Sequence, residues 1–378
     1  MRLFIITTPF TGHITPTFNM AKSLTNMRHN VDYITTSQWE SAIQEIGAGL
    51  IPYEHNRKLS PMIIDAYKIA LSIGSQYDGI IYDELFFPGK ALGNAIGIPT
   101  VRFFPCVAIN EQIMTRLIHG NGFMGIFRSS FIRKRWTKEI CKGLIPNVDD
   151  WTDEVVYNAP DCNIVFVPEW FQPMLSDFPS DKFHFVGPSI YNDLKAPDWL
   201  TETKQPVIYV SLGTIDNKQL RFYKNCLQVF ADKDARFVLS VGNKIPIEKL
   251  GTIPSNCTIF SYAPQKKILE HADLFITHGG MNSVNEAMIN GVPMLVFPVS
   301  NDQPINAERV EELGIGKTLD IKNLDGEILW ESISEILSNK IILTRAKEAE
   351  DKLYNNNGAE KAVKAIISFI STLKNDHS

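Results

Sequence analysis

The stretch that decides the fold spans residues 262–303 and reads YAPQKKILEHADLFITHGGMNSVNEAMINGVPMLVFPVSNDQ. Within it, an apolar run of strand length at 274–277 stops at a His-Gly-Gly turn, and a pattern of helical periodicity follows. A Gly-Val-Pro sequence at 291–293 ends the helical pattern, and a second apolar run comes after it. Strand, glycine turn, helix and strand in this order indicate parallel α/β structure.

The turn after the first of these strands has the features of an anion-binding site. The first N–H groups of a helix lack partners within the helix and lie at the positive end of its dipole. Glycines let a ligand approach the backbone, and His278, Asn282 and Ser283 add side-chain donors. Glu286, one helical turn further on, is suited to accepting bonds from hydroxyls. We therefore predict a phosphate or diphosphate beside a polyol, with a turn that binds nothing as the alternative.

A second candidate site follows the first apolar run of the chain, where residues 12–16 read GHITP. Helical periodicity begins at Ile14, and Pro16 restricts where that helix can start. Strands alternate with helical patterns over the first hundred residues, and in such doubly wound sheets ligands bind at the carboxyl ends of the strands. An imidazole at that edge suits general-base catalysis near neutral pH. The alternative is that His13 only caps or packs the turn.

Asp83 ends another apolar run, residues 80–82, and is expected at the same edge of the sheet as His13. A carboxylate bonded to one ring nitrogen would fix the tautomer of His13 and stabilise the imidazolium formed on proton uptake. Two alternatives stand beside this interpretation. Asp83 caps the helix that starts near Pro88, or the neighbouring Glu84 is the partner of His13.

Length and composition are those of an ordinary globular protein. The 378 residues suit two domains, and 44% hydrophobic with 21% charged residues is typical of soluble chains. A net charge of −5 argues against a nucleic-acid-binding protein. The five cysteines form no closely spaced pair, and the sequence shows no metal-ligand cluster. No apolar run is long enough for a signal peptide or a membrane span, so we expect a cytoplasmic location.

Nearly all of the opening stretch resembles the donor-binding signature of the UDP-glycosyltransferase superfamily. The resemblance is carried by Ala263-Pro264-Gln265, His271, Thr277-His278-Gly279-Gly280, Asn282-Ser283, Glu286-Ala287, Gly291-Val292-Pro293 and Asp302-Gln303. In plant members a tryptophan that stacks on uracil usually occupies the position of Tyr262, and their stretch between Gln265 and His278 is longer. Both departures favour the bacterial macrolide glycosyltransferase branch.

This resemblance implies a fold and a division into domains. The implied fold is the α/β GT-B fold, with two Rossmann-like βαβ domains facing a central cleft and a C-terminal helix that crosses back to the first domain. We assign residues 1–190 to an acceptor-binding domain, on which the final helix at 355–375 packs, and residues 207–354 to a nucleotide-sugar-binding domain. Residues 191–206, which are rich in proline and polar residues, are expected to form the linker.

The implied activity is inverting transfer of a hexose, with glucose favoured, from a UDP-sugar to a hydroxyl of a small hydrophobic acceptor. Macrolides, flavonoids and other phenols or alcohols are the expected acceptor classes. His13 matches the family's catalytic base, Asp83 its carboxylate partner, and neither a metal nor a resident cofactor is expected. The alternatives are a UDP-sugar epimerase of similar fold and a non-catalytic subunit that binds nucleotide sugars.

The resemblance also implies the residues that hold the substrates. Donor contacts are expected from Thr11, Gly12, Ser211, Gly213, Thr214, Tyr262, Ala263, Gln265, His278, Gly280, Asn282, Ser283, Glu286, Asp302 and Gln303. The aromatic residues Phe86, Phe87 and Phe104 are expected to contact the acceptor. Two parts of the donor set have purely structural alternatives. Residues 211–214 could form a loop that binds nothing, and Asp302 could cap a helix that starts near Pro304.

Residues 108–150 interrupt the alternation of strands and helices. They carry aromatic residues interspersed with arginines and lysines. One interpretation is a pair of helices covering the first domain with a solvated basic face. The other is a wall of the acceptor pocket that also makes weak contact with an acidic membrane surface through residues 123–138. The two interpretations are compatible.

Overall fold

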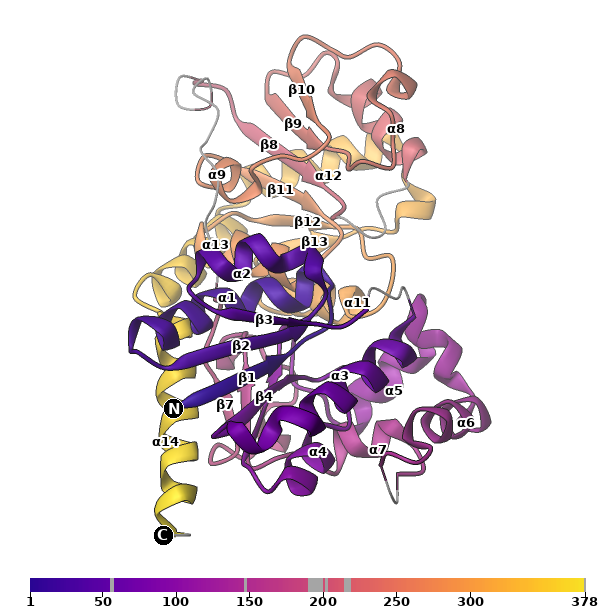
Figure 1. Cartoon of the computed structure of the whole chain (residues 1–378). Helices are drawn as coiled ribbons and strands as arrows, with labels where there is room; N and C mark the ends of the chain where they lie inside the picture. The colour runs from indigo at the N-terminus through magenta and orange to yellow at the C-terminus, as the bar shows by residue number, and fades with distance from the viewer. Residues whose placement is uncertain (55–57, 146–147, 190–199, 201–202, 214–218, 377–378) are drawn as a thin grey trace. The chain divides into compact units, whose positions relative to one another are not determined.

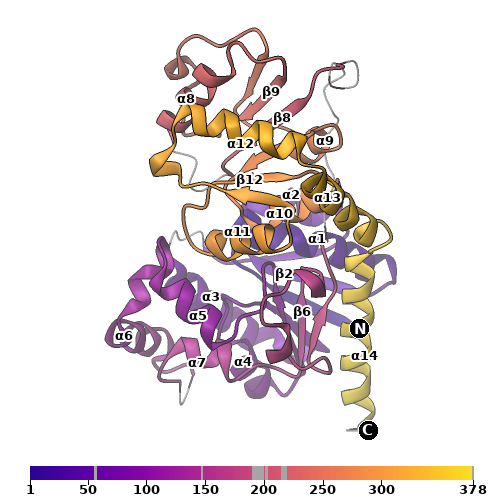
Figure 2. The same ribbon diagram turned by 180° about the vertical axis from the view of Figure 1, so that it is seen from behind.

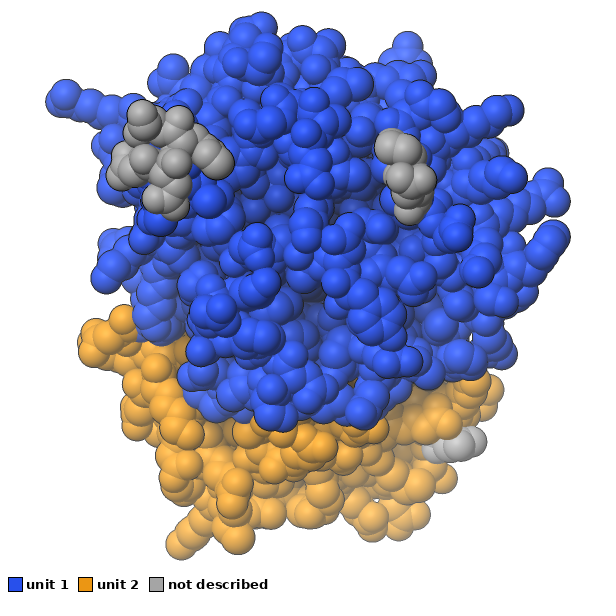
Figure 3. All heavy atoms as spheres, turned by 90° about the horizontal axis from the view of Figure 1, so that it is seen from below, with its two compact units in different colours: residues 1–120, 124–191, 356–378 blue, residues 121–123, 192–355 orange. Residues whose placement is uncertain are grey.

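Two parallel β-sheets, each in its own unit of the chain, form the framework of the protein (Figure 1). The computed structural model describes residues 1–54, 58–145, 148–189, 200, 203–213 and 219–376. Unit 1 comprises residues 1–120, 124–191 and 356–378, and unit 2 comprises residues 121–123 and 192–355 (Figure 3). Most of the predicted linker and the predicted donor residue Thr214 lie outside the described residues.

The sheet of unit 1 has the strand order β3-β2-β1-β4-β5-β6-β7, and all its pairings are parallel. Its strands are β1 (Arg2–Ile6), β2 (Asn30–Thr35), β3 (Gly49–Pro52), β4 (Gly79–Asp83), β5 (Thr100–Phe104), β6 (Cys162–Val165) and β7 (Phe183–Phe185). The inner strands β4, β5 and β6 are buried along their whole length. Burial on both faces explains why these strands form continuous apolar runs in the sequence rather than alternating patterns.

The helices of unit 1 cover this sheet and extend beyond it. They are α1 (Thr11–Asn26), α2 (Glu40–Glu45), α3 (Leu59–Ile73), α4 (Gly89–Ile96), α5 (Glu111–His119), α6 (Ser130–Cys141), α7 (Trp151–Val156) and α14 (Gly358–Asp376). The final helix α14 packs on α1 and β6 and buries Ile366 and Ile370 completely (Figure 2). The return of the last helix to the first unit agrees with the fold that the resemblance implies.

Unit 2 repeats the same design with the strand order β10-β9-β8-β11-β12-β13, again with parallel pairings. Its strands are β8 (Val207–Ser211), β9 (Arg236–Ser240), β10 (Cys257–Phe260), β11 (Leu274–Thr277), β12 (Met294–Val296) and β13 (Gly316–Thr318). Its helices are α8 (Leu220–Phe230), α9 (Gln265–Leu269), α10 (Met281–Ile289), α11 (Gln303–Glu312), α12 (Gly326–Ser338) and α13 (Lys340–Leu353). The predicted pair of Rossmann-like domains is confirmed.

The order of strands reverses at one point in each sheet. In unit 1 the chain adds β2 and β3 on one side of β1 and then continues on the other side with β4. In unit 2 the same reversal separates β8 from β11. The loops that leave the two strands at such a point diverge to opposite faces of the sheet, and ligands of doubly wound proteins bind there.

Helix α1 begins earlier in the chain than the sequence predicts. The sequence predicts a helix from about Ile14 whose start is limited by Pro16, but α1 begins at Thr11 and includes Pro16. Proline cannot donate to the carbonyl of Gly12, so the helix loses one bond in its second turn. The buried face of α1, which includes Phe18, offsets that loss. His13 therefore lies in the first turn of α1 rather than in a loop before it.

None of the helices among the described residues is both long enough and apolar enough to cross a membrane.

The packing of α14 gives a first prediction. We expect Ile370→Ala to lower the free energy of unfolding by about 3 kcal/mol, because it removes a fully buried side chain from the core of unit 1. Lys364→Ala, which alters an exposed position on the same helix, is the matched control and should change stability by less than about 0.5 kcal/mol. Urea unfolding followed by circular dichroism measures both. Equal effects would show that α14 does not depend on this contact.

Candidate active site

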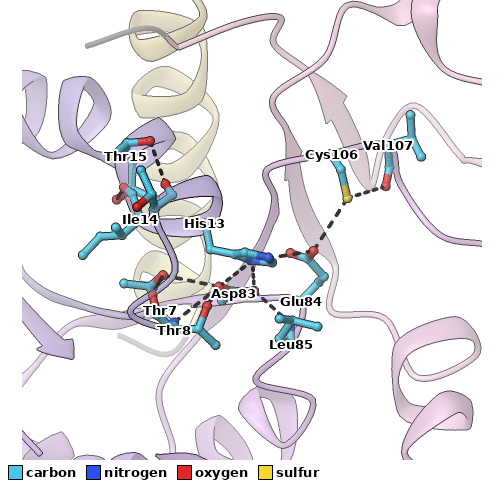
Figure 4. A network of polar contacts seen from close by, with 12 residues as sticks. Thr7, Thr8, His13, Ile14, Thr15, Asp83, Glu84, Leu85, Cys106 and Val107 are labelled. Atoms are coloured by element: carbon cyan, nitrogen blue, oxygen red, sulfur yellow. Dashed lines mark hydrogen bonds and ion pairs between the residues drawn. The ribbon is translucent and has the colours of Figure 1, made fainter. Parts of the chain in front are cut away.

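The carboxyl ends of β1 and β4 bring His13 and Asp83 together at the reversal point of unit 1 (Figure 4). The Nδ1 atom of His13 lies 3.1 Å from Oδ1 and 3.0 Å from Oδ2 of Asp83. The imidazole is partly exposed, whereas the carboxylate is completely buried. The structure thus forms the predicted pair, and Asp83 points to His13 rather than capping the helix near Pro88.

The Asp83 carboxylate is held by backbone and hydroxyl donors as well as by the imidazole. The hydroxyl of Thr8 donates to Oδ2 at 3.1 Å, the hydroxyl of Thr7 at 3.3 Å, and the backbone N–H of Leu85 donates to Oδ1 at 2.9 Å. Burial alone would raise the pKa of Asp83, but the charge of His13 and then the hydrogen bonds from His13 and the backbone of Leu85 lower it below its ordinary value. Because an ionised carboxylate only accepts, Nδ1 of His13 carries a proton, and in the neutral imidazole Nε2 then carries the lone pair.

Glu84 lies next to this pair but is in a different ionisation state. Its Oε1 atom is 3.9 Å from Nδ1 of His13, further than either oxygen of Asp83. Burial, and then the negative charge of Asp83, raise the pKa of Glu84 well above its ordinary value. The thiol of Cys106 donates to Oε1 of Glu84 at 3.7 Å (Figure 4). Glu84 is therefore a neutral neighbour, and Asp83 is the charged partner of His13.

The same three side chains form a potential metal-ligand group. One ligand atom each of His13, Asp83 and Glu84 can be chosen so that all lie within 4.8 Å of one another. Two features weigh against a cation there. Nδ1 of His13 is committed as a donor to Asp83, and the raised pKa of Glu84 favours a carboxyl group that has kept its proton.

His278 lies at the reversal point of unit 2, directly after β11 and beside the end of β8. Its imidazole packs against the backbone of two glycines. A Cβ added at Gly213 or at Gly280 would lie 2.6 Å from Nε2 of His278. Gly213 also has a φ of +73°, which side chains rarely adopt. The two glycines therefore fix the ring at the start of α10, where no side chain of the N-cap residue occupies the first N–H groups.

A hydrogen-bond network beside His278 orients the predicted ribose-binding carboxylate. The amide of Gln265 donates to Oε2 of Glu286 at 2.7 Å and to the hydroxyl of Ser283 at 3.1 Å. Its carbonyl accepts from the hydroxyl of Tyr209 at 3.3 Å. Burial raises the pKa of Glu286, and the bond from Gln265 opposes that change. The structure thus links three of the predicted donor residues directly.

The loop after β12 arranges Asp302 and Gln303 through contacts within the loop and with α11. The Oε1 atom of Gln303 accepts from the backbone N–H groups of Val299 at 2.8 Å and Ser300 at 3.1 Å. Asp302 is at the N-cap position of α11, but its side chain accepts no bond from the first backbone N–H groups. Its Oδ2 atom instead accepts from the amide of Asn306 at 2.9 Å. Asp302 therefore lies at the N-cap position, as the capping alternative predicts, but its side chain does not make the capping hydrogen bond.

The remaining predicted donor residues lie at the ends of the same elements. Thr11 and Gly12 are exposed at the start of α1, and Tyr262 is exposed before α9. Ala263 is buried, and the hydroxyl of Ser211 accepts from the N–H of Gly213 at 3.4 Å. Asn282 is half-buried in the first turn of α10. These residues form one group in unit 1 and another in unit 2.

The three phenylalanines predicted to contact an acceptor are core residues of unit 1. Phe86, Phe87 and Phe104 are at most 4% exposed. The ring of Phe104 stacks on Phe183, and the ring of Phe87 packs against Trp136. This packing accounts for their aromatic character without a ligand. Their contact with an acceptor stays a prediction.

Several residues that support the site are absent from the sequence prediction. They are Thr7, Thr8, Tyr209, Asn306 and Glu84 in its neutral state. The threonines had a usable signal, since they directly follow β1 and therefore share an edge with Asp83. Asn306, in α11, donates to the carbonyl of Gly279 at 2.9 Å as well as to Asp302, and no local pattern indicates this contact between α11 and the turn after β11.

The geometry agrees with a comparison with solved structures. The glycotransferase of kitacinnamycin shares 28% sequence identity with the chain, covers 97% of both chains and superposes with a TM-score of 0.80. The two Rossmann-like units and the returning final helix are thus the GT-B fold of glycosyltransferases, as predicted.

Sequence relatives define the family. Residues 200–347 match the model of the UDP-glucoronosyl and UDP-glucosyl transferase family. NDP-glycosyltransferase YjiC of Bacillus subtilis (strain 168) is 32% identical over 387 residues, which cover 97% of the chain and 96% of the relative. Oleandomycin glycosyltransferase of Streptomyces antibioticus is 23% identical over 384 residues, with 94% and 87% covered. The chain belongs to this glycosyltransferase family, and its likeness to the macrolide branch is confirmed.

The neutral state of Glu84 gives a second prediction. Since its pKa is raised on folding, its contribution to stability is fully present below the unfolded pKa near 4.5 and is lost as the pH rises through the folded pKa. Glu84→Gln cannot ionise, so its thermal midpoint should fall less than that of the wild type as the pH rises from about 5 to about 8.

The matched control is Glu139→Gln, an exposed position on α6. Its midpoint should follow the wild-type curve. Parallel curves for the wild type and Glu84→Gln would mean that Glu84 is ionised in the folded protein throughout this range.

Proposed function

We propose that the protein transfers a hexose, with glucose favoured, from a UDP-sugar to a hydroxyl of a small hydrophobic acceptor, with inversion and without a metal. The observation that carries this proposal is the pair formed by His13 and Asp83 at the reversal point of the first sheet. A partly exposed imidazole backed by a buried, ionised carboxylate is the arrangement required of a general base.

In the proposed reaction, Nε2 of His13 takes the proton of the acceptor hydroxyl while the oxygen attacks the anomeric carbon. The bond from that carbon to the diphosphate breaks on the opposite face, so the configuration of the sugar inverts and UDP leaves with the bonding electron pair. Asp83 stabilises the imidazolium that forms, and it need not take up the proton itself. Thr7, Thr8 and Leu85 keep Asp83 ionised and in place.

The second unit supplies the groups suited to the UDP part of the donor. A diphosphate at the start of α10 would meet backbone N–H groups and the imidazole of His278. Glu286, oriented by Gln265, is placed one turn further on, where it suits ribose hydroxyls. Asp302, held by Asn306, and the amide of Gln303 are the candidates for contacts with the sugar.

The acceptor class rests on relatives. The chain is similar to oleandomycin glycosyltransferase and to the glycotransferase of kitacinnamycin, and this similarity favours hydrophobic alcohols or phenols as acceptors.

The experiment that tests the proposal is an assay of UDP-glucose with and without a panel of phenolic and macrolide acceptors. The proposed transferase releases UDP only with acceptor, and NMR of the product shows a β-linked glucoside. An isomeric UDP-sugar formed without acceptor would identify an epimerase instead, and binding without turnover would identify a non-catalytic subunit. Addition of EDTA should leave the rate unchanged, and a loss restored by Mg²⁺ or Mn²⁺ would contradict metal independence.

The base gives a third prediction. His13→Ala should lower transfer to an aliphatic alcohol by at least about 100-fold, the usual contribution of general-base catalysis. A phenol of low pKa should lose less, because it needs less help to release its proton. UDP affinity measured by calorimetry should stay the same. Wild-type rates with the aliphatic alcohol would remove His13 from the mechanism.

The contact of His278 with glycine gives a fourth prediction. In Gly280→Ala the added Cβ would displace the imidazole of His278, and we expect UDP affinity to fall about tenfold. The control is a double-mutant cycle. In a His278→Ala background, Gly280→Ala should have little further effect, because the displaced ring is already gone. Additive losses in the cycle would show that Gly280 acts on UDP independently of His278.

A further inference from the structure

Helix α6 has two faces of different character. Its inner face consists of Arg133, Trp136, Thr137, Ile140 and Cys141, at the spacing of one side of a helix. The ring of Trp136 packs edge-on against Phe127 with 4.9 Å between the ring centroids. Arg133 donates to Asp150 at 2.9 Å. These contacts fix α6 to the rest of unit 1 and account for its inner residues.

The outer face of α6 is a row of cations. Lys134, Arg135 and Lys138 are exposed, and Lys142 directly follows the helix on the same side. Among the described residues, none of the four forms an ion pair. Like charges three or four positions apart on a helix repel one another and slightly destabilise it. Lys138, in the last turn, interacts favourably with the helix dipole, but the repulsion among the four cations is not relieved by ion pairs within the described residues.

Large apolar side chains are exposed beside these cations. Phe131, in the first turn of α6, is 72% exposed, and Ile132 is 46% exposed. Phe131 shares its side of the helix with Lys134, Arg135 and Lys138, at spacings of three, four and seven. Ile126, in the short turn of 3-10 helix that precedes α6, is 51% exposed.

The local charge contrasts with that of the whole chain. Residues 124–142 contain six arginines and lysines and one acidic residue, a net charge of +5, whereas the chain as a whole has a net charge of −5. In both ribbon views α6 lies at the periphery of unit 1, outside α5 and α7 (Figures 1 and 2).

We propose that the outer face of α6 docks on the surface of an anionic lipid bilayer, with Phe131 and Ile132 entering the interfacial layer. Cations beside exposed aromatic and aliphatic side chains match a surface whose headgroups are negative and whose interior is apolar. A nucleic acid would use the charge but would gain little from Ile126 and Ile132. The proposal is independent of the sugar-transfer reaction, since none of these residues belongs to the candidate active site.

The test is cosedimentation of the full-length protein with vesicles. The protein should bind vesicles of equal parts phosphatidylglycerol and phosphatidylcholine and should not bind pure phosphatidylcholine. Each basic residue near an anionic surface contributes about fivefold in affinity. The variant Lys134→Glu/Arg135→Glu/Lys138→Glu should therefore bind at least about 100-fold more weakly. Phe131→Ser/Ile132→Ser should bind about tenfold more weakly, because its apolar contribution is lost.

Two controls separate docking from general electrostatic attraction and from misfolding. Lys224→Glu/Lys249→Glu/Lys340→Glu makes the same change in net charge at exposed positions of unit 2 and should bind vesicles like the wild type. All variants should keep the wild-type circular dichroism spectrum and thermal midpoint, because the altered side chains are exposed.

Insertion of residue 131 into the bilayer is measured by fluorescence quenching. In Phe131→Trp, vesicles with brominated acyl chains should quench the added fluorescence more strongly than they quench that of the wild type. The proposal would be overturned if the wild type did not bind anionic vesicles. It would also be overturned if both charge-reversal variants lost the same amount of affinity, or if the serine variant bound as tightly as the wild type. The proposal would also be overturned if the protein bound duplex DNA as tightly as it binds vesicles and lost that binding in the α6 charge-reversal variant. That result would assign the outer face of α6 to a polyanion.

Discussion

The reversal of strand order in each sheet is the constraint on which the candidate site depends. Two adjacent strands, β1 and β4 in unit 1 and β8 and β11 in unit 2, end side by side while their connections diverge to opposite faces. Residues that are 70 positions apart, such as His13 and Asp83, thereby become hydrogen-bonded neighbours. The same topology sets Gly213 against His278 in unit 2. One arrangement of strands, used twice, thus places both the His13–Asp83 pair and the glycine-flanked imidazole of His278.

The buried carboxylate of Asp83 is costly, and the structure offsets that cost with specific donors. Thr7, Thr8 and Leu85 donate to it, and the imidazole of His13 completes its shell. Two adjacent buried carboxylates would repel each other, so the neighbouring Glu84 is the group that keeps its proton. The carboxylate of Asp83 is then the anion of this pair, and it contacts Nδ1 of His13. There it can stabilise the positive charge that spreads over the imidazole ring when His13 takes up a proton.

The sequence predicts the parts of the site that follow buried strands, because the end of an apolar run marks the edge of a parallel sheet. That reasoning is sufficient for His13, Asp83 and His278. It does not separate burial from function where both have the same sequence signal: Phe86 and Phe87 are aromatic residues packed in the core of unit 1, and their contact with an acceptor stays a prediction. It also cannot identify contacts such as that of Asn306 with Gly279, which depend on how α11 packs beside the turn after β11.

The donor residues of unit 2 are held in place by one another before any substrate binds. Gln265 orients Glu286, Asn306 orients Asp302, and the glycines on either side confine His278. Groups fixed in this way need little rearrangement when charge develops on a leaving diphosphate, so more of their interaction energy stabilises the transition state. The same argument explains why small changes in the support are expected to matter. A single added methyl at Gly280 alters no donor or acceptor, yet it moves the imidazole on which the proposed diphosphate contact depends.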